Sequence, residues 1–480
     1  MPAFSTPDVY VREIKVFPPS VAEVESAIPA FIGYTQIATR DAADDLRNKP
    51  TLIYSMTEFE QYFGGPWPQQ LTVAVNSRPD GSKQSLVVGE PALEYFLYHS
   101  MKLFFDNGGG KCYVVSVGGY KAAPGPFVVE ADLTGGLNAV AAEDEPTLLV
   151  IPEAVRLATV DQFGNVARAM LQQCQTLGDR FAILDLYDGY KGLAGTIPVG
   201  AGTKTVVQAH RENVWTLDID ILKYGGAYYP FLRTTMNPVV NAAESNVNVL
   251  IDGAAAPGVV LNTLKAPGAG QNLEVYNAAK LALSKFFLTL PPSGAIAGVY
   301  AYTDTNRGVW KAPANVPLSD VVEPVVKLDS AQQGPLNVDP TSGKSINALR
   351  AFAGKGTLVW GARTLAGNDN EWRYINVRRF FNTVEESVKK STYWAVFETN
   401  DANTWVKVRG MIEAYLTQKW REGALAGARP QDAFFVRCGL GTTMNFQDIL
   451  EGRMNVEIGM AVVRPAEFII LKFSHKMQVS

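Results

Sequence analysis

Cysteine and histidine are scarce in this sequence. Its 480 residues include three cysteines and three histidines. Cys112, Cys174 and Cys438 are far apart, odd in number and absent from any Cys-x-x-Cys pair, so the sequence argues against a disulfide framework and predicts buried free thiols. No histidine has a second histidine or a cysteine at the spacing of zinc ligands. We therefore expect neither a metal nor a cofactor.

A long apolar run and an excess of positive charge are also missing. No stretch approaches the roughly 20 apolar residues that a helix needs to cross a bilayer, and the first ten residues lack the features of a signal peptide. The net charge is -4, whereas nucleic-acid-binding proteins usually carry a basic face. These properties predict synthesis and folding in the cytoplasm, no membrane insertion and no nucleic-acid partner.

Catalytic motifs are equally rare. The stretch "TSGKS" has the end of a phosphate-binding loop, but the glycine that the motif requires is replaced by Val338 and no strand precedes it. Asp185 and Asp188 follow an apolar strand, at the edge where ligands bind to open parallel sheets. Strand ends often carry aspartate only to start a turn. The two aspartates therefore support an α/β hydrolase-like enzyme only weakly.

What the sequence does contain is an α/β pattern. Residues 147–187 read as a strand, a helix and a second strand, and their uninterrupted apolar strands favour a parallel sheet covered on both faces. Further strands are expected at 29–35 and 112–117, with a helix from Pro91 to Asn107 between them. A second helix followed by a strand is expected over residues 272–304. Residues 66–88 and 188–210 read as surface excursions.

The last quarter changes to long helices. The spacing of apolar residues predicts one helix over 376–397 and another after Asp401 or Asn403, either of which can cap it. Arg373, Arg378 and Arg379 form a small basic cluster. We interpret this cluster as a solvated helix face, with a contact for an acidic partner as the alternative.

Both ends of the chain carry short β-prone runs. Phe468, Ile469, Ile470 and Leu471 lie within a dozen residues of the last residue, where chains usually fray. A strand so close to the end needs a partner, in the same molecule or in the next one. A similar run near the first residue contains four apolar positions: Val9, Tyr10, Val11 and Ile14.

Several blocks of the sequence resemble the contractile tail sheath proteins of phage tails, tailocins and extracellular contractile injection systems. The blocks occur in the order of that family, from residue 6 to about residue 474. The most specific are "NRGVWKAPAN" and "RPAEFIILKFS". The others are "TPDVYVREI", "PPSVAEVESAIPAFIGYT", "NGGGKCYVVSV", "VWGARTL" and "RYINVRRFFNTVEESVKKSTYWAVFETND".

The resemblance implies an α/β protein with a subtilisin-like middle domain, an α+β C-terminal domain and extended arms at both ends. Subtilisin's catalysis does not carry over, because no histidine or serine lies in a protease motif. The expected parts are an N-terminal linking arm (1–27), an α/β core (28–360), a C-terminal, tube-facing domain (361–465) and a C-terminal linking strand (466–480).

The resemblance also implies a function. The chain would be a structural subunit, not an enzyme, that polymerises around an inner tube and contracts. Neighbouring subunits would exchange the two terminal runs. Candidate contacts with the tube are Asp448, Glu451 and Arg453, in a short helix expected within 444–453. The implied partners are copies of itself, the tube protein, baseplate and terminal cap proteins and sister sheath proteins.

The implied location is a phage tail or a released injection particle, assembled in the bacterial cytoplasm. A scaffold polymer that never contracts remains an alternative, because contraction is a property of the assembled lattice and not of one sequence. The hydrolase-like enzyme is the second alternative.

Overall fold

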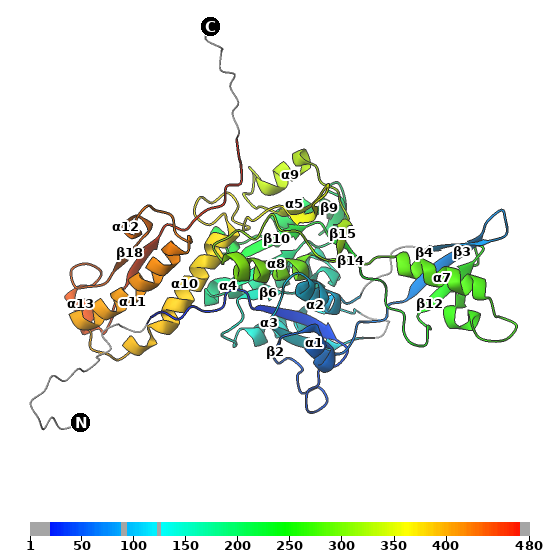
Figure 1. Cartoon of the computed structure of the whole chain (residues 1–480), viewed down its shortest axis with the longest axis horizontal. Coiled ribbons are helices and arrows are strands. Elements are labelled where there is room, and N and C mark those ends of the chain that lie inside the picture. Colours follow the sequence, from blue (N-terminus) through cyan, green and yellow to red (C-terminus); the bar gives the residue numbers. More distant parts are fainter. Residues whose placement is uncertain (1–19, 88–93, 122–125, 471–480) are drawn as a thin grey trace, which may run out of the picture. The chain divides into compact units, whose positions relative to one another are not determined.

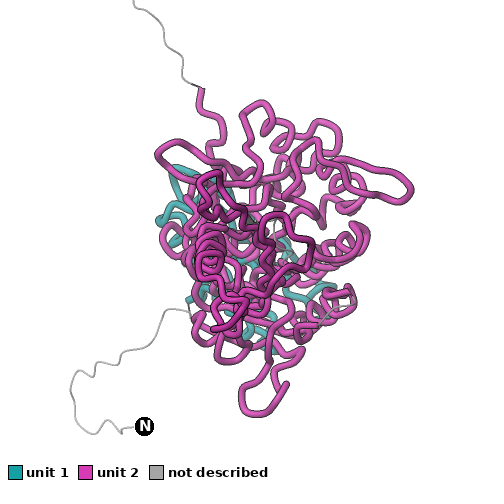
Figure 2. Tube along the Cα trace, turned by 90° about the vertical axis from the view of Figure 1, so that its right-hand side faces the viewer, with its two compact units in different colours: residues 1–24, 383–463 teal, residues 25–382, 464–480 magenta. Residues whose placement is uncertain are grey.

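The chain divides into two compact units. A computed structural model describes residues 20–87, 94–121 and 126–470. Unit 1 comprises Met1–Val24 and Thr383–Val463, and unit 2 comprises Glu25–Asn382 and Arg464–Ser480 (Figure 2). No helix in the described ranges combines the length and the apolar character that a membrane span requires.

A large mixed sheet forms the centre of unit 2 (Figure 1). Its six inner strands run parallel, and an antiparallel strand closes each edge. In spatial order the strands are β17 (Gly356–Val359), β16 (Asn347–Phe352), β10 (Gly225–Tyr229), β7 (Phe181–Asp185), β6 (Leu148–Val150), β1 (Pro29–Thr35), β5 (Cys112–Gly119) and β2 (Thr51–Ile53). The predicted α/β class and the strand–helix–strand unit at 147–187 are confirmed.

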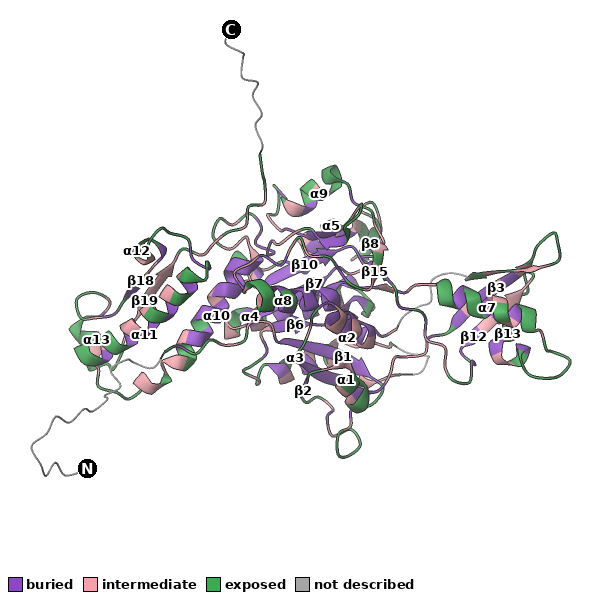
Figure 3. Ribbon diagram, in the orientation of Figure 1, coloured by how far each residue is buried: buried purple, intermediate pink, exposed green. Residues whose placement is uncertain are grey.

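Helices cover both faces of this sheet. Adjacent residues of a strand point to opposite faces. Phe31 of β1 contacts Phe104 of α2 (Leu97–Asp106), whereas Ile32 lies against Gly136 of α3 (Glu130–Val140). Helix α8 (Ser293–Arg307) packs beside α2, and α4 (Val160–Leu177) packs beside α3. The four central strands, β10, β7, β6 and β1, are accordingly buried along their length (Figure 3).

The expected strand in "GAIAGVYAYTD" is wrong, because this stretch lies in helix α8. Gly294 and Gly298 are one helical turn apart and face the backbone of α2. A Cβ atom on Gly294 would lie 2.4 Å from the carbonyl oxygen of Ser100, and one on Gly298 would lie 2.5 Å from that of Phe104. A short apolar run can be a buried helix as easily as a buried strand, and periodicity alone does not separate them.

A second sheet of unit 2 has its own small core. Its strands, in spatial order, are β13 (Val259–Val260), β12 (Val247–Ile251), β3 (Leu71–Ser77) and β4 (Lys83–Val87). Alternate residues such as Val73 and Val249 are fully buried beside Val275 of α7 (Leu273–Lys285). Residues 66–88, expected as a surface excursion, thus contribute two of these strands.

The other elements of unit 2 are short. They are α1 (Met56–Phe63), α5 (Val206–Ala209), α6 (Ile219–Leu222), α9 (Ser330–Asn337), β8 (Thr196–Val199), β9 (Gly202–Thr205), β11 (Leu232–Thr234), β14 (Thr289–Leu290) and β15 (Val321–Pro324). Helix α2 begins at Leu97, later than predicted, and Pro91 lies outside the described residues.

Unit 1 is built on helices. Helix α10 (Ile375–Ser391) crosses the division between the units, and α11 (Ala402–Arg421) follows it. Of the two predicted caps, Asp401 is the one that caps α11, because its side chain accepts a hydrogen bond from the Thr404 amide at 3.0 Å. The remaining elements are α12 (Pro430–Ala433), β18 (Phe434–Arg437), α13 (Phe446–Leu450) and β19 (Glu457–Met460).

The described part of the N-terminal segment lies along these helices. The amides of Ala22 and Val24 donate to the hydroxyls of Ser391 and Ser387, each at 3.0 Å. Glu23 forms an ion pair with buried Lys419 at 2.6 Å. Residues 20–24 are therefore fixed within unit 1.

The predicted solvated face is wrong for two of the three clustered arginines. Arg378 and Arg379 are each only 3% exposed. Arg379 forms an ion pair with Asp304 of α8 at 2.5 Å, and the Arg378 guanidinium lies 4.5 Å from the centre of the Trp372 ring. The carboxylate that pairs with Arg379 comes from within unit 2, which also removes the need for an acidic partner there.

Candidate intersubunit site

A buried ion pair holds the start of the C-terminal segment on unit 2. Arg363 is 4% exposed, and its Nε atom lies 3.0 and 3.1 Å from the two carboxylate oxygens of Glu467. Its Nη2 atom lies 2.6 Å from Oε2 of the same carboxylate. Such bidentate pairing fixes the relative orientation of the two side chains as well as the distance between them.

Two further side chains donate to Glu467. The Tyr374 hydroxyl lies 3.2 Å from Oε2, and the Asn337 amide nitrogen donates to Oε1. Burial alone would raise the pKa of Glu467, but hydrogen bonds from Arg363 and Asn337 outweigh it and hold the pKa below its usual value. We call Glu467 and these three partners the C-terminal anchor.

The residues directly after the anchor are apolar and exposed. Phe468, Ile469 and Ile470 are 70, 78 and 80% exposed and belong to no strand. Isolated exposed apolar residues are ordinary, but three large ones in a row indicate a contact surface. Leu471 and the four apolar positions of the N-terminal run (Val9, Tyr10, Val11 and Ile14) lie outside the described residues.

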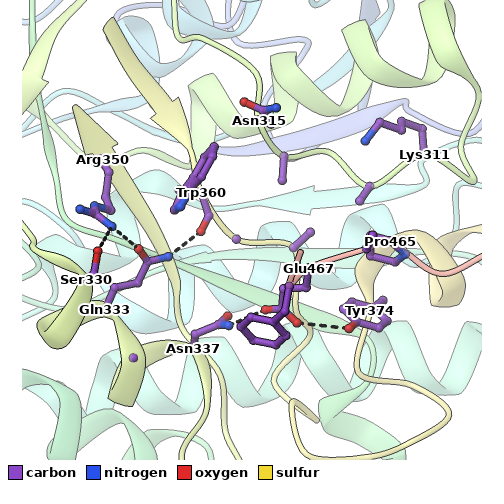
Figure 4. Close-up of a pocket in the computed structure, with 17 residues that line it drawn as sticks. Lys311, Asn315, Ser330, Gln333, Asn337, Arg350, Trp360, Tyr374, Pro465 and Glu467 are labelled. Carbon is purple, nitrogen blue, oxygen red and sulfur yellow. Dashed lines mark hydrogen bonds between the residues drawn. The ribbon is translucent and has the colours of Figure 1, made fainter. Parts of the chain in front are cut away.

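A cavity of about 470 Å³ lies beside the anchor (Figure 4). Pro465, Ala466 and Phe468 form part of its wall. Trp360 and Tyr374 contribute aromatic surface. Lys311 and Arg350 also line it, and Figure 4 shows them on different sides of Trp360.

The short helix expected within 444–453 is confirmed as α13, in unit 1. Its three tube-contact candidates lie together. Arg453 pairs with Asp448 at 2.8 Å and also with Glu451. The backbone amide of Asn445 and the guanidinium of Arg453 both donate to Asp448 and hold its pKa below the usual value. These charges therefore satisfy one another in the single chain.

Sequence reasoning missed the apolar face of the same helix. Phe446 and Leu450 are 74 and 82% exposed. Residues four apart lie on one side of a helix, so the two side chains form a joint apolar surface. The four-residue spacing of Phe446 and Leu450 in "NFQDIL" could have predicted this apolar surface from the sequence.

A two-stranded sheet completes the candidate surfaces of unit 1. Strands β18 and β19 are antiparallel, with Phe434 opposite Met460 and Arg437 opposite Glu457. No other described strand pairs with either of them. Each strand therefore has one edge whose backbone groups can accept a further strand.

The aspartates considered for catalysis have structural roles. Asp185 is buried and accepts hydrogen bonds from the Ser293 amide at 2.9 Å and the Ser293 hydroxyl at 2.5 Å. Burial raises the pKa of Asp185 to about 7, against the lowering effect of these bonds. Asp188 pairs with Lys191 at 2.8 Å. The three cysteines are buried and free, as predicted.

Comparison with known proteins adds sequence similarity. Residues 367–476 match the family model of the phage tail sheath C-terminal domain. The tail sheath protein of Vibrio phage KVP40 is 32% identical over 131 residues, and that of Enterobacteria phage T4 is 28% identical over 130 residues. These alignments cover 27 and 26% of this chain. They span only 19% of the length of either phage protein.

Two solved assemblies are similar along the whole chain. The contracted helical sheath of the anti-feeding prophage is 28% identical, with a TM-score of 0.62, and covers 99% of this chain and 100% of its own. The contracted sheath complex of an extracellular contractile injection system, PVC, is 27% identical with a TM-score of 0.62 and covers 99% of both chains.

Proposed function

We propose that the chain is a contractile tail sheath protein that polymerises helically around an inner tube and contracts to drive that tube through a target envelope. Members of this family are structural sheath subunits of phage tails and extracellular contractile injection systems, not enzymes. The observation that carries the proposal is the similarity along the whole chain to two contracted sheaths.

The subunits are joined by exchanged strands. Phe468 to Leu471 of one subunit add a strand to β18 or β19 of a neighbour, and the N-terminal run, which includes Val9, Tyr10, Val11 and Ile14, makes a similar contact. The exposed run after Glu467 and the open edges of the two-stranded sheet support this arrangement. Strand addition supplies backbone hydrogen bonds together with pockets for alternate side chains. Because donor and acceptor surfaces differ, the contact repeats head to tail and builds a helix.

The parts of the chain have separate tasks. The core (28–360) has a subtilisin-like arrangement without its catalysis, which agrees with a parallel sheet covered by helices on both faces. The tube-facing surface comes from the C-terminal domain (361–465) and includes Asp448, Glu451 and Arg453. The exposed Phe446 and Leu450 beside them extend this surface. The arms (1–27 and 466–480) connect the subunits.

Energy for contraction is stored when the subunits assemble. Rigid subunits reorient on a baseplate signal, and the two arrangements of the lattice differ in packing. The further partners are the baseplate, a terminal cap and sister sheath proteins. Assembly takes place in the bacterial cytoplasm, and the finished sheath is part of a phage tail or an extracellular injection particle.

Electron microscopy of the purified chain at several concentrations tests the proposal. We expect hollow, ridged rods of uniform width, which are the contracted form reached without a tube. If small discrete particles persist at every concentration, even after the tube protein is added, the proposal is wrong. Rods that form around a tube but never shorten would instead indicate a scaffold that does not contract.

A further inference from the structure

The cavity beside the C-terminal anchor carries two positive charges without a carboxylate partner. Neither Lys311 nor Arg350 forms an ion pair with any residue that the structure describes. Arg350 donates from Nη1 to Gln333 at 2.8 Å and to Ser330 at 3.4 Å. Its Nε atom is buried and has no acceptor in the described chain. Buried donors almost always have a partner.

Lys311 also lacks a carboxylate partner among the described residues. Burial, and then the nearby charge of Arg307, lower the pKa of Lys311. A lysine that loses water without gaining a carboxylate is less stable as a cation. Among the described residues, the only acid that lines the cavity is Glu467, and its oxygens are already bound to Arg363, Tyr374 and Asn337. The described lining of the cavity is therefore electropositive and offers no carboxylate to Lys311 or Arg350.

Part of the remaining lining is apolar. This part consists of Trp360, which is 37% exposed, and three alanines: Ala312, Ala314 and Ala362. Gln333 links the charged and apolar sides, since it accepts from Arg350 and donates to the backbone oxygen of Trp360 at 2.8 Å. A suitable occupant combines an apolar side chain with a carboxylate. The apolar side chain would pack against Trp360, and the carboxylate would pair with Lys311 or Arg350.

The position of the cavity identifies the occupant. The anchor holds Pro465 to Phe468 as one wall, and the same segment continues into the exposed run at Phe468 to Ile470. According to the proposed function, this run binds to a neighbouring subunit. The cavity would then lie next to a contact between two copies of the chain. We propose that the cavity receives a segment of a second copy of this chain that bears a carboxylate beside an apolar side chain. This inference rests on the proposed function.

Charge reversal tests the proposal. The double variant Lys311→Glu, Arg350→Glu should raise the protein concentration needed for rod formation by about tenfold or more, since like charges would face each other. A matched control is Lys285→Glu, Lys355→Glu, which reverses two exposed lysines of unit 2 away from the cavity and should change this concentration less than about twofold. Equal behaviour of both double variants, with unchanged thermal unfolding of the monomers, would overturn the proposal.

A second measurement does not depend on the stability of the reversed variants. A photoreactive benzoyl-phenylalanine replaces Trp360, and rods are grown from a mixture of this variant and isotope-labelled wild-type chain. Crosslinks from position 360 should join two different copies and map to a peptide with Asp or Glu next to apolar residues. Crosslinks within one copy only, or to a peptide without Asp or Glu, contradict the proposal. Absence of rods from the wild-type chain would instead count against the proposed function.

Discussion

Arg363 and Glu467 are 104 positions apart in the sequence, and their ion pair, 2.6 Å from Nη2 to Oε2, holds the start of the C-terminal segment on the rest of unit 2. Removal of the carboxylate by Glu467→Ala would leave a buried guanidinium unpaired. We expect a loss of about 3 kcal/mol in the free energy of unfolding. This value is at the lower end of the range for buried ion pairs, because the Glu467 side chain is 20% exposed. Chemical denaturation of the monomer measures this loss.

Two controls accompany this prediction. Glu212→Gln breaks a more exposed pair with Lys204 and should cost less than about 1 kcal/mol. The double variant Arg363→Met, Glu467→Met removes both charges and should recover most of the stability. If Glu467→Ala is no less stable than Glu212→Gln, the anchor has no energetic role.

Truncation separates the anchor from the exchanged run. A chain that ends at Glu467 keeps the anchor and loses Phe468 to Leu471, so we expect a monomer with wild-type thermal stability that forms no rods. Removal of 466–480 also deletes Glu467 and should give a folded but less stable monomer that does not polymerise, because Arg363 is then unpaired. Thermal unfolding and electron microscopy of both truncations check these outcomes. Rods from either truncated chain would refute strand exchange through this end.

Asp185 makes stability depend on pH. Its pKa is raised from 3.8 to about 7 in the folded chain. Between these values the folded chain binds more protons than the unfolded chain, so the free energy of unfolding falls as the pH rises from about 4 to about 7, by up to ~1.4 kcal/mol per pH unit. Asp185→Asn stays neutral and can still accept from Ser293, so its stability advantage over wild type should grow with pH.

Thermal unfolding at a series of pH values measures this difference. Glu153, whose pKa burial raises to about 8, keeps part of the pH dependence in both proteins. Asp41→Asn is the matched control, because Asp41 is exposed. Parallel pH profiles for Asp185→Asn and wild type would show that Asp185 does not contribute.

Helix α13 should bind the tube through its apolar face as well as its charges. Because Phe446 and Leu450 are exposed, their joint replacement by alanine should change monomer stability by less than about 0.5 kcal/mol. The same variant should weaken co-assembly with the tube protein about tenfold or more, as expected for apolar contacts at an interface. Arg453→Glu should also weaken it, while both variants still form sheath-only polymers. Leu281→Ala, on an exposed face of α7, is the control. Unchanged tube binding by both variants would remove α13 from the tube-facing surface.

Local patterns in the sequence were sufficient for much of the fold. Apolar runs of strand length marked β1 and β5, and the cap at Asp401 marked the start of α11. The errors concern contacts between distant residues. The stretch around Gly294 and Gly298 forms a helix that packs closely against α2. A contact between elements so far apart in the sequence cannot be predicted from a local pattern.

The candidate site was only half predictable for the same reason. The exposed run after Glu467 could be recognised from its apolar residues. Its anchor could not, because Arg363 and Glu467 are too far apart in sequence for any spacing rule. Buried Arg379 was mistaken for a surface residue, since its partner Asp304 lies 75 positions away.

The most direct test of the account is a helical reconstruction by cryo-electron microscopy of rods grown from the wild-type chain. We predict continuous density from Glu467 into a neighbouring subunit, where Phe468 to Leu471 add a strand to the sheet of β18 and β19. Density in which this run instead folds back onto its own subunit, with both edges of that sheet unpaired, would contradict the account.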